Sequence, residues 1–407
     1  MNTRTVSAVL FSFLLFAACN LNSSKPDDIQ EIITIDFSRN MPEKVVKEIV
    51  DDVKFIVLET TDEVLIEALP RIAYVSQDLV MLYNTGEGSI YTFNHEGKIM
   101  SNFNRTGQGP MEYNSITGLT YDEINKEIYV VDDRRRRRMQ VYSETGQYKR
   151  TLPFPDNMEF EDIFSFDDEL LLVHDTYGIG IVGLDLDRGQ EANAKPYVFL
   201  SKKDGSIAGY VDITLSQRIS TSFAIGSDPS SQYVRVSRYS TCGIIKNGPD
   251  FLLADIASDT VYLLTRDKKP TPLIVRKPSV HDTNPQELLG VTFRTDNLLL
   301  ISKWVNERNR NRSNTLFFTY DFSDHRFYKV KDYNTIFPND QFLTTVEHSS
   351  YGDCGCDYND KGTIVNVRQA FALKEQLEEG VLKGKLKDIA MKLDAEDNPV
   401  LVIIKMK

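Results

Sequence analysis

A pair of strand-like runs separated by a short turn recurs along this chain, and this repeated hairpin constrains the fold more than any other feature. In its clearest copy, Ile128–Val131 and Met139–Tyr142 are rich in β-branched and aromatic residues, and a turn at Gly146 follows them. Equivalents of the second run occur five more times, at Ile90–Phe93, Ile181–Leu184, Val261–Leu264, Leu316–Tyr320 and Val400–Ile403.

The last residues of these six runs are 49, 42, 80, 56 and 83 residues apart. Three of the spacings lie near the period of about 40–50 residues that four-stranded propeller blades show. Many short strands with regular turns are typical of an all-β assembly, and a ring of blades leaves only short sheet edges exposed. The sequence therefore predicts a six-bladed β-propeller of four-stranded antiparallel blades.

The two long spacings predict insertions, with an extra blade as the alternative. Residues Ala370–Leu393 are rich in Ala, Leu, Lys and Glu, and their apolar residues recur at helical spacing, interrupted by Gly380 and Gly384. We expect two short helices there, as an insert at about 370–394 in the last blade. The segment Asp204–Gln232 is rich in Ser and Gly and is expected to form a long loop in the fourth blade.

Closure of the ring needs one more strand, because the chain ends soon after Val400–Ile404. The N-terminal run Val53–Leu58 is a strand candidate that the six repeats leave without a blade. Its pairing with the last strand would lock the two ends of the chain together. The run Ile32–Phe37 is the alternative for the same role.

The first residues have the pattern of a signal peptide. Arg4 precedes the apolar run Val6–Phe16, which is shorter than the ~20 residues that a membrane-spanning helix needs. Small residues then precede Cys19, as they precede signal-peptide cleavage sites. We expect three parts of the chain: a signal peptide at 1–18, a polar tether at 19–30 and the propeller at 31–407.

The ending Phe16–Cys19 resembles a bacterial lipobox, in which the cysteine is lipidated and becomes the mature N-terminus; Phe16 stands where that motif usually has Leu. An ordinary signal peptide cut nearby is the alternative. We expect a cell-envelope protein held to the membrane through a lipid on Cys19. The outer membrane is favoured, because Asn20 is not the Asp that retains lipoproteins at the inner membrane.

The chain carries 47 basic and 59 acidic side chains, a net charge of −12. This balance disfavours a nucleic-acid partner. Besides Cys19, the chain has Cys242, Cys354 and Cys356, an odd number that cannot all pair internally. A bridge between Cys354 and Cys356 would be strained, so free thiols and a distant pairing both fit the sequence.

The segment Asp133–Gly146 is similar to the NHL-type propeller repeat, in which an Asp, a strand like Arg-Ile-Gln-Val-Phe and a Gly turn recur. The loop Gly107–Tyr113 resembles the Gly-rich Glu-Tyr signature of the six-bladed propeller lipoproteins of Bacteroidetes, with Met111 where that family usually has Gly. The ending Glu396–Ile404 is also similar to that of the family. The resemblance covers about residues 50–407 and the leader, and it implies a fold and a location more than an activity.

Two arginine-rich hairpins are candidates for a binding site. They are Arg134–Arg138 in blade two and Glu307–Arg312 in blade five. In a propeller, hairpins between second and third strands share one face with the loops between blades, and blades two and five of six lie opposite each other. Arginine recognises carboxylate and sulfate groups in a planar, bidentate way, and a cluster of arginines attracts anions.

We therefore expect an anionic glycan or peptide ligand on this face. The candidate residues are Arg134, Arg135, Arg136, Arg137, Arg308, Arg310, Arg312, Tyr113 and Trp304, where the two aromatic rings would stack on a sugar. The alternative is that the hairpins are solvated, with local ion pairs, and that the rings pack between blades. Arg138 matches the structural arginine of the NHL repeat, and Gly107–Tyr113 lacks the features of a phosphate loop and is favoured as a turn.

Motifs for catalysis or metal binding are weak. Residues 357–368 match part of a calcium loop, but Lys361 and Arg368 stand where ligands are required. The five histidines are scattered, and His174–Asp175, at the end of a predicted second strand, is placed near the channel mouth. We expect no metal and no cofactor.

Together these features favour a lipid-anchored, non-enzymatic binding or scaffold protein whose partner is an anionic glycan or a protein, in addition to the membrane. A propeller hydrolase or lyase with a site at the central channel mouth is the alternative. A structural component of an outer-membrane assembly is a third hypothesis. The sequence carries no indication of the oligomeric state.

Overall fold

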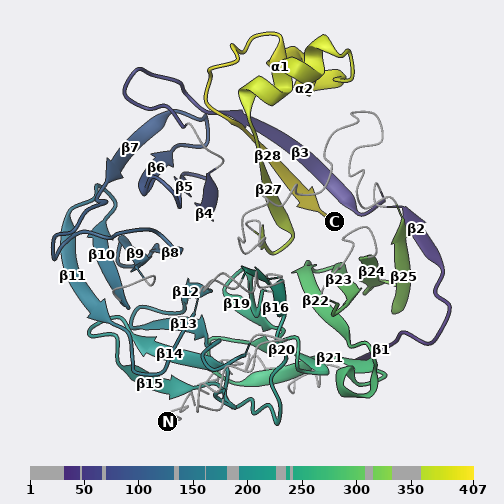
Figure 1. Ribbon diagram of the computed structural model, residues 1–407. Helices are drawn as coiled ribbons and strands as arrows, with labels where there is room; N and C mark the ends of the chain where they lie inside the picture. Colours follow the sequence, from purple (N-terminus) through teal and green to yellow (C-terminus); the bar gives the residue numbers. More distant parts are fainter. Residues whose placement is uncertain are drawn as a thin grey trace, which may run out of the picture. The chain divides into compact units, whose positions relative to one another are not determined.

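The computed structural model describes residues 32–45, 48–66, 70–132, 137–160, 162–180, 192–225, 235–238, 242–307, 315–331 and 359–407. Residues Ile32–Lys407 form one compact unit. In this unit, six four-stranded antiparallel blades stand in a ring, and the predicted six-bladed β-propeller is confirmed (Figure 1).

The first three blades follow one another along the chain. Blade one contains β4 (Arg71–Val75), β5 (Val80–Tyr83), β6 (Ser89–Phe93) and β7 (Ile99–Asn104). Blade two contains β8 (Gly118–Asp122), β9 (Glu127–Asp132), β10 (Arg138–Ser143) and β11 (Tyr148–Pro153). Blade three contains β12 (Ile163–Ser165), β13 (Leu170–His174), β14 (Tyr197–Ser201) and β15 (Ile207–Tyr210).

The second half of the ring has the same order of strands from the centre outward. Blade four contains β18 (Ile244–Asn247), β19 (Asp250–Leu253), β20 (Thr260–Leu264) and β21 (Pro270–Lys277), followed by the 3-10 helix η2 (Val280–Asp282). Blade five contains β22 (Glu287–Arg294), β23 (Leu298–Val305), β24 (Leu316–Asp321) and β25 (Arg326–Lys331). Blade six contains β26 (Asn359–Asp360), β27 (Thr363–Arg368), β28 (Val400–Met406) and, from the N-terminal part of the chain, β3 (Val50–Val57).

The N-terminal segment closes the ring. Strand β3 pairs antiparallel with β28 along seven registered residue pairs, so the prediction for Val53–Leu58 is confirmed. The alternative run has a different place: β1 (Ile33–Asp36) adds in parallel to β21 at the outer edge of blade four. Strand β2 (Glu43–Val45) adds in the same way to β25 of blade five. Residues 33–57 therefore follow the outside of three consecutive blades.

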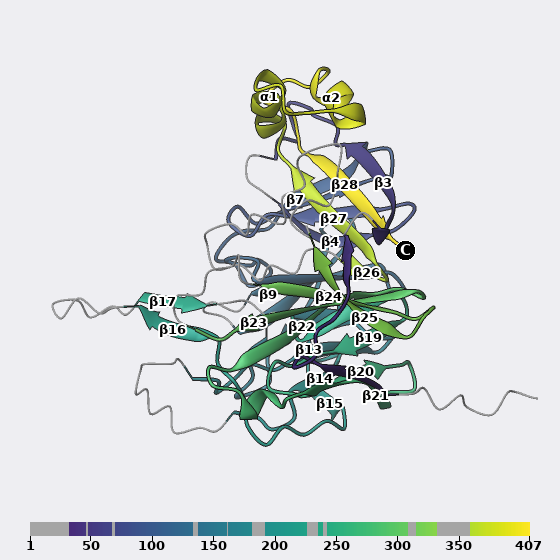
Figure 2. The ribbon, with the colours of Figure 1, turned by 90° about the vertical axis from the view of Figure 1, so that its right-hand side faces the viewer.

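Two predictions about blades three and four need correction. The third strand of blade three is β14, whereas the expected run Ile181–Leu184 lies outside the described residues. The expected long loop Asp204–Gln232 begins with β15, the outer strand of blade three, and continues into a hairpin of β16 (Ser222–Ile225) and β17 (Arg235–Arg238). Figure 2 shows this hairpin projecting from the face of the ring that is turned toward the viewer in Figure 1.

The predicted helical insert is present in blade six, between β27 and β28. It consists of α1 (Ala370–Glu378) and α2 (Gly384–Ala390), which bury Leu373 and Leu386 in a shared apolar cluster. Gly380 separates the helices with φ of 72°, a conformation that side chains disfavour. None of the helices in the described part of the chain is long and apolar enough to cross a bilayer.

The turn between third and fourth strands carries a left-handed residue in each of blades one to five. These residues are Gly97, Gly146, Gly205, Lys268 and His325. A Cβ atom at Gly97 would lie 2.0 Å from the carbonyl oxygen of Val57, and one at Gly205 would lie 2.7 Å from that of Pro153. The two glycines thus allow the turn to touch the outer strand of the preceding blade, and for blade one that strand is β3.

Candidate functional site

The arginine run of blade two begins outside the described residues, which include only its last two members. Arg134, Arg135 and Arg136 are outside, as are Arg308, Arg310 and Arg312 of the blade-five hairpin. Arg137 has φ of 46°, and its guanidinium donates hydrogen bonds to the carbonyl oxygens of Met158 at 2.7 Å and Pro155 at 3.4 Å. Arg137 therefore holds the next interblade connection in place.

Alternate residues of β10 hold the loop Gly107–Tyr113. Arg138 donates to the carbonyl oxygens of Glu112 and Pro110, and its Nε lies 3.4 Å from the Asp132 carboxylate. Gln140 Nε2 donates to the same two carbonyl oxygens at 3.0 and 2.9 Å, and Tyr142 donates to Met111 at 2.8 Å. Because side chains two residues apart share one face of a strand, the Arg-x-Gln-x-Tyr pattern forms a ladder of donors.

Both aromatic candidates are buried. Tyr113 has an exposed fraction of 0%, and its hydroxyl donates to the carbonyl oxygen of Gly88 at 2.5 Å. Trp304 is 8% exposed and packs in the apolar cluster between blades three, four and five. Gly290 makes room for the indole, since a Cβ atom there would lie 2.8 Å from the ring. In this structure both rings serve blade packing and offer little surface to a sugar.

The structure tests the predictions about the cysteines only in part, because it describes one of the four. Cys242 is disulfide-bonded. Cys19, Cys354 and Cys356 lie outside the described residues, as does most of the 353–362 segment. Among the described residues, no group of three or more His, Cys, Asp or Glu side chains is arranged to hold a metal ion.

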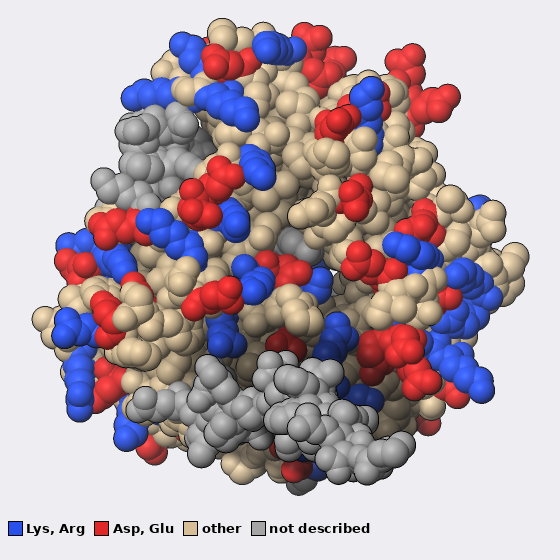
Figure 3. All heavy atoms as spheres, turned by 180° about the vertical axis from the view of Figure 1, so that it is seen from behind, with Lys and Arg blue, Asp and Glu red and all other residues tan. Residues whose placement is uncertain are grey.

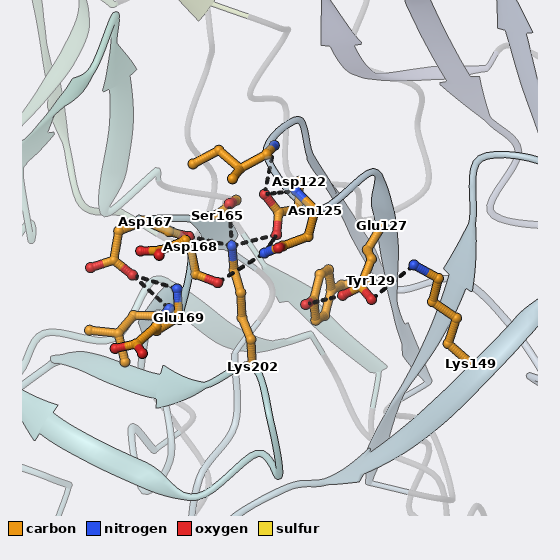
Figure 4. Close-up of polar contacts among 12 residues, drawn as sticks. Asp122, Asn125, Glu127, Tyr129, Lys149, Ser165, Asp167, Asp168, Glu169 and Lys202 are labelled. Carbon is orange, nitrogen blue, oxygen red and sulfur yellow. Dashed lines mark hydrogen bonds and ion pairs between the residues drawn. The ribbon is translucent and has the colours of Figure 1, made fainter.

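A buried lysine lies at the centre of a polar cluster between blades two and three (Figure 4). Lys202, in the turn after β14, is 3% exposed. Its Nζ donates to Oδ2 of Asp122 at 2.6 Å, to Oγ of Ser165 at 2.8 Å and to the carbonyl oxygen of Asp167. An ammonium group has three donors, so all three are used. Burial lowers the pKa of Lys202, and the hydrogen bond with Asp122 opposes that change.

The second half of this cluster is centred on Glu127, the first residue of β9. Its carboxylate accepts hydrogen bonds from both terminal nitrogens of Arg150 at 2.8 and 2.7 Å, from Tyr129 at 2.7 Å and from Lys149 at 3.0 Å. Burial raises the pKa of Glu127, but these hydrogen bonds outweigh it and lower the pKa to about 2. Arg150 also donates to the carbonyl oxygen of Lys202 at 2.8 Å and thereby joins the two halves.

A second buried cluster joins blades three and four. Nε2 of His174, the last residue of β13, lies 2.8 Å from Oδ2 of Asp255, and Nη2 of Arg218 lies 3.1 Å from the same oxygen. Asp255 is 5% exposed. Although burial raises its pKa, the hydrogen bond and charge of His174, with the charge of Arg218, lower it to about 2. The predicted histidine is thus inside the protein and paired.

The backbone around this cluster is adapted to the imidazole. A Cβ atom at Gly243 would lie 2.3 Å from Nδ1 of His174, so only glycine leaves room for the ring. The Tyr197 ring stacks on His174 with centroids 5.3 Å apart, and the Tyr197 hydroxyl donates to Gly243 at 3.2 Å. Arg218 also donates to the carbonyl oxygens of Asp175 and Asn193, each at 3.0 Å.

The centre of the ring is crossed by side chains from three blades. Lys246 in β18 of blade four pairs with Asp360 in β26 of blade six, with 2.8 Å between Nζ and Oδ2. The same Nζ lies 5.4 Å from the ring centroid of Tyr74 in blade one, which is opposite blade four. These contacts join blades one, four and six near the turn between β18 and β19.

Comparison with known proteins identifies the family. A family model described as a domain of unknown function, DUF4934, matches residues 32–405. The chain belongs to the DUF4934 family. No curated protein matches the sequence.

Solved structures are similar to this DUF4934 chain to different degrees. One is a protein of Bacteroides fragilis NCTC 9343 that is named as a putative exported protein. It has 15% sequence identity to this chain and a TM-score of 0.62, and the similarity covers 93% of this chain and 100% of that chain. Another is a member of the DUF4221 family from Bacteroides vulgatus ATCC 8482, with 11% identity and a TM-score of 0.47, over 88% and 97% of the two chains. The first likeness shows the propeller fold.

The described polar clusters of this DUF4934 propeller act as clamps between blades. Lys202 has no unused donor, and Asp255 and His174 face each other inside the protein. The sequence analysis pointed to His174, at the end of a second strand, but it missed Asp255, Lys202, Glu127 and Arg218. The shared position of His174 and Asp255 in adjacent blades was the available signal for the second cluster.

Proposed function

We propose that this chain is an exported, lipid-anchored binding or scaffold protein that takes an anionic glycan or peptide on the face bearing the blade-two and blade-five hairpins. The observation that carries the proposal is the set of hydrogen bonds made by the residues that follow the blade-two arginine run. Arg138, Gln140 and Tyr142 pin the neighbouring interblade loop, and Arg137 pins the next connection. Arg134, Arg135 and Arg136 lie in the sequence just before these anchored residues, and a ligand site whose flanking residues are already held needs less ordering on binding.

The position of the acid–base groups also supports binding over catalysis. The buried groups with shifted pKa values, Lys202, Glu127 and Asp255, are each engaged by several partners, and for Lys202 and Asp255 these include a residue of a neighbouring blade. The Lys246–Asp360 pair lies near the turn between β18 and β19, on the side opposite the hairpins between second and third strands.

The distribution of charge favours the same face. Figure 3 shows the opposite face, where acidic and basic side chains are interspersed. With a net charge of −12, the protein repels anions at long range. An anionic ligand therefore needs a local group of arginines, and the candidates are those of the two hairpins, now without Arg137 and Arg138, which support the fold.

The test is a binding measurement with sulfated and carboxylated polysaccharides on an array. We expect the triple change of Arg134, Arg135 and Arg136 to Ala to weaken binding at least tenfold and to reduce its salt dependence. Arg326→Ala, at the exposed first residue of β25 in blade five, is the control and should bind as the wild type does. Equal binding by the triple variant and the control would contradict the proposal.

The proposed anchor has a separate test. Cys19→Ala should move the protein from the membrane fraction to the soluble fraction of the envelope. Retention of the variant in washed membranes would contradict lipid anchoring without affecting the ligand proposal.

A further inference from the structure

The blade-two hairpin joins its blade beside two polar side chains with unused hydrogen-bonding capacity. The backbone N–H of Asn114 donates to Oδ1 of Asp132, the last residue of β9, at 3.1 Å. The side-chain Oδ1 of Asn114 is buried and has no hydrogen-bond partner among the described residues, and the same is true of Oγ of Ser115. A buried polar atom without a partner costs free energy, so each such atom calls for an explanation. Asn114, Ser115 and Asp132 are called the blade-two root below.

Blade one adds a hydrogen-bond donor beside this root. The Tyr113 hydroxyl donates to the carbonyl oxygen of Gly88 at 2.5 Å, and it thereby joins the loop that leads to Asn114 to the blade-one turn that begins at Asn84. Asn84 is 3% exposed, and its Oδ1 accepts two backbone hydrogen bonds from its own turn. These bonds fix the amide, whose Nδ2 is buried without a partner in the described part of the chain. The two joined segments therefore hold an unused donor, an unused acceptor and an unused hydroxyl.

The blade-five hairpin has a similar asparagine where it joins its blade. Asn306 directly precedes Glu307, the first residue of that hairpin. Its Nδ2 donates to the carbonyl oxygen of Ser220 and to Oε1 of Gln286, both at 3.2 Å, whereas its Oδ1 is buried and unpaired among the residues that the structure describes. An asparagine with a buried, unused carbonyl oxygen thus accompanies both arginine-rich hairpins.

The charged group of the blade-two root is already matched. The Asp132 side chain is fully buried, and its carboxylate accepts from the Asn114 backbone and lies 3.4 Å from Nε of Arg138. The capacity that remains is neutral. The side chains of Asn114 and Ser115 make no hydrogen bond with a described residue, and both residues are half-buried. Rotation about the Cα–Cβ bond can therefore bring either polar group to the surface without breaking a contact of this kind.

We propose that the blade-two root binds hydroxyl groups of a polysaccharide whose sulfate or carboxylate groups are bound by Arg134, Arg135 and Arg136. The inference rests on the proposed anion-binding function of this face and narrows its ligand to a glycan. A sugar hydroxyl both donates and accepts hydrogen bonds, so it matches a donor, an acceptor and a hydroxyl that lie in joined segments. An ionised acidic side chain of a peptide only accepts, and it would leave the carbonyl oxygen of Asn114 unpaired.

The test measures binding of the full chain to immobilised chondroitin sulfate, which carries hydroxyl, sulfate and carboxylate groups. We expect Asn114→Ala combined with Ser115→Ala to raise Kd by about fivefold or more, because neutral hydrogen bonds are lost. The salt dependence of binding should stay that of the wild type, since no charge is removed. Asn247→Ala is the matched control. Asn247 also has a buried Oδ1 without a described partner, but it lies at the turn between β18 and β19, on the opposite face. This control should bind as the wild type does.

Poly-L-glutamate is the second probe, because it has carboxylates and no hydroxyl groups. The double variant should bind it as the wild type does, and an equal loss of affinity for both polymers would overturn the glycan assignment. If the wild type binds chondroitin sulfate through the arginines and the double variant binds it equally well, the inference is overturned and the proposed function stands. If the wild type binds neither polymer, both are overturned. Should the double variant not fold, Ser115→Ala alone gives the same readout.

Discussion

The two buried polar clusters perform the same task in different ways. Between blades two and three, Lys202 uses all three of its donors, and the Asp122 carboxylate accepts from Lys202, Asn125 and the backbone. Between blades three and four, Asp255 is shared by His174 and Arg218, and Nε of Arg218 is buried without a hydrogen-bond partner among the described residues. One cluster is saturated and the other has unused capacity.

Because of this difference, we expect the two clusters to respond differently to substitution of one of their residues. In a saturated cluster, the loss of one member leaves a buried charge with no replacement partner, and such a charge is costly. In the second cluster, Arg218 keeps its bonds to Asp175 and Asn193 when Asp255 changes. We therefore expect the first cluster to be the less tolerant of the two.

The largest effect is expected for Lys202→Met. The substitution keeps an unbranched chain but leaves Asp122 buried without its cation, so we expect the free energy of unfolding to fall by about 3–5 kcal/mol. Urea denaturation followed by circular dichroism measures it. Lys203→Met is the control, since Lys203 is the exposed neighbour, and it should change stability by less than about 0.5 kcal/mol. Similar losses for both variants would show that the cluster is not a clamp.

A smaller loss is expected for Asp255→Asn in the second cluster. The amide keeps the shape of the side chain but removes the charge that faces His174 and Arg218, so we expect a loss of about 2–3 kcal/mol. The measurement is the same urea titration, with exposed Asp78→Asn as the control. A loss for Asp255→Asn that exceeds that of Lys202→Met would reverse the comparison.

The difference between the clusters was only partly foreseeable from the sequence. The repeat of strands and turns predicts the six blades, and the unassigned run Val53–Leu58 predicts ring closure, because both depend on local patterns. Lys202 and Lys203 are the same residue type in the same turn, yet one is buried and the other exposed. Their difference arises from Asp122, which is 80 positions away in the chain, and no local pattern encodes such a contact.

The error in blade three has a similar physical origin. Ile181–Leu184 and Tyr197–Ser201 are both apolar runs, and either could follow β13 at an acceptable distance. The structure uses the second, whose Tyr197 and Phe199 pack in the apolar cluster shared with blade four. The choice between the runs depends on that tertiary packing.

The pH dependence of stability should involve both clusters. Glu127 and Asp255 have pKa values of about 2, below their ordinary values of 4.5 and 3.8. A carboxyl group whose pKa falls on folding stabilises the protein above its ordinary pKa, and this contribution is lost as pH falls toward the lower value. We therefore expect stability to decrease between about pH 4.5 and 2. Asp255 alone accounts for about 2 kcal/mol of that loss.

Urea midpoints measured from pH 6 to pH 2 test this expectation. Glu127→Gln and Asp255→Asn should each flatten the profile, because each removes a carboxyl group whose pKa is lowered in the folded protein. A wild-type profile that is level down to pH 2 would contradict the role of both carboxylates.

The smallest effect is expected for Gly243→Ala, which tests how closely the second cluster fits its histidine. The added Cβ atom would lie 2.3 Å from Nδ1 of His174, so the ring must shift from its place beside Asp255 and we expect a loss of about 1–2 kcal/mol. Gly209→Ala is the control, since a Cβ atom there meets nothing within 4 Å.

The double variant Gly243→Ala with Asp255→Asn tests whether the two residues act through the same histidine. Asp255→Asn already removes the carboxylate that His174 faces, so a shift of the ring should then cost less. We therefore expect the double variant to lose less stability than the sum of the two separate losses. Strict additivity would show that Gly243 acts on packing independently of the His174–Asp255 pair.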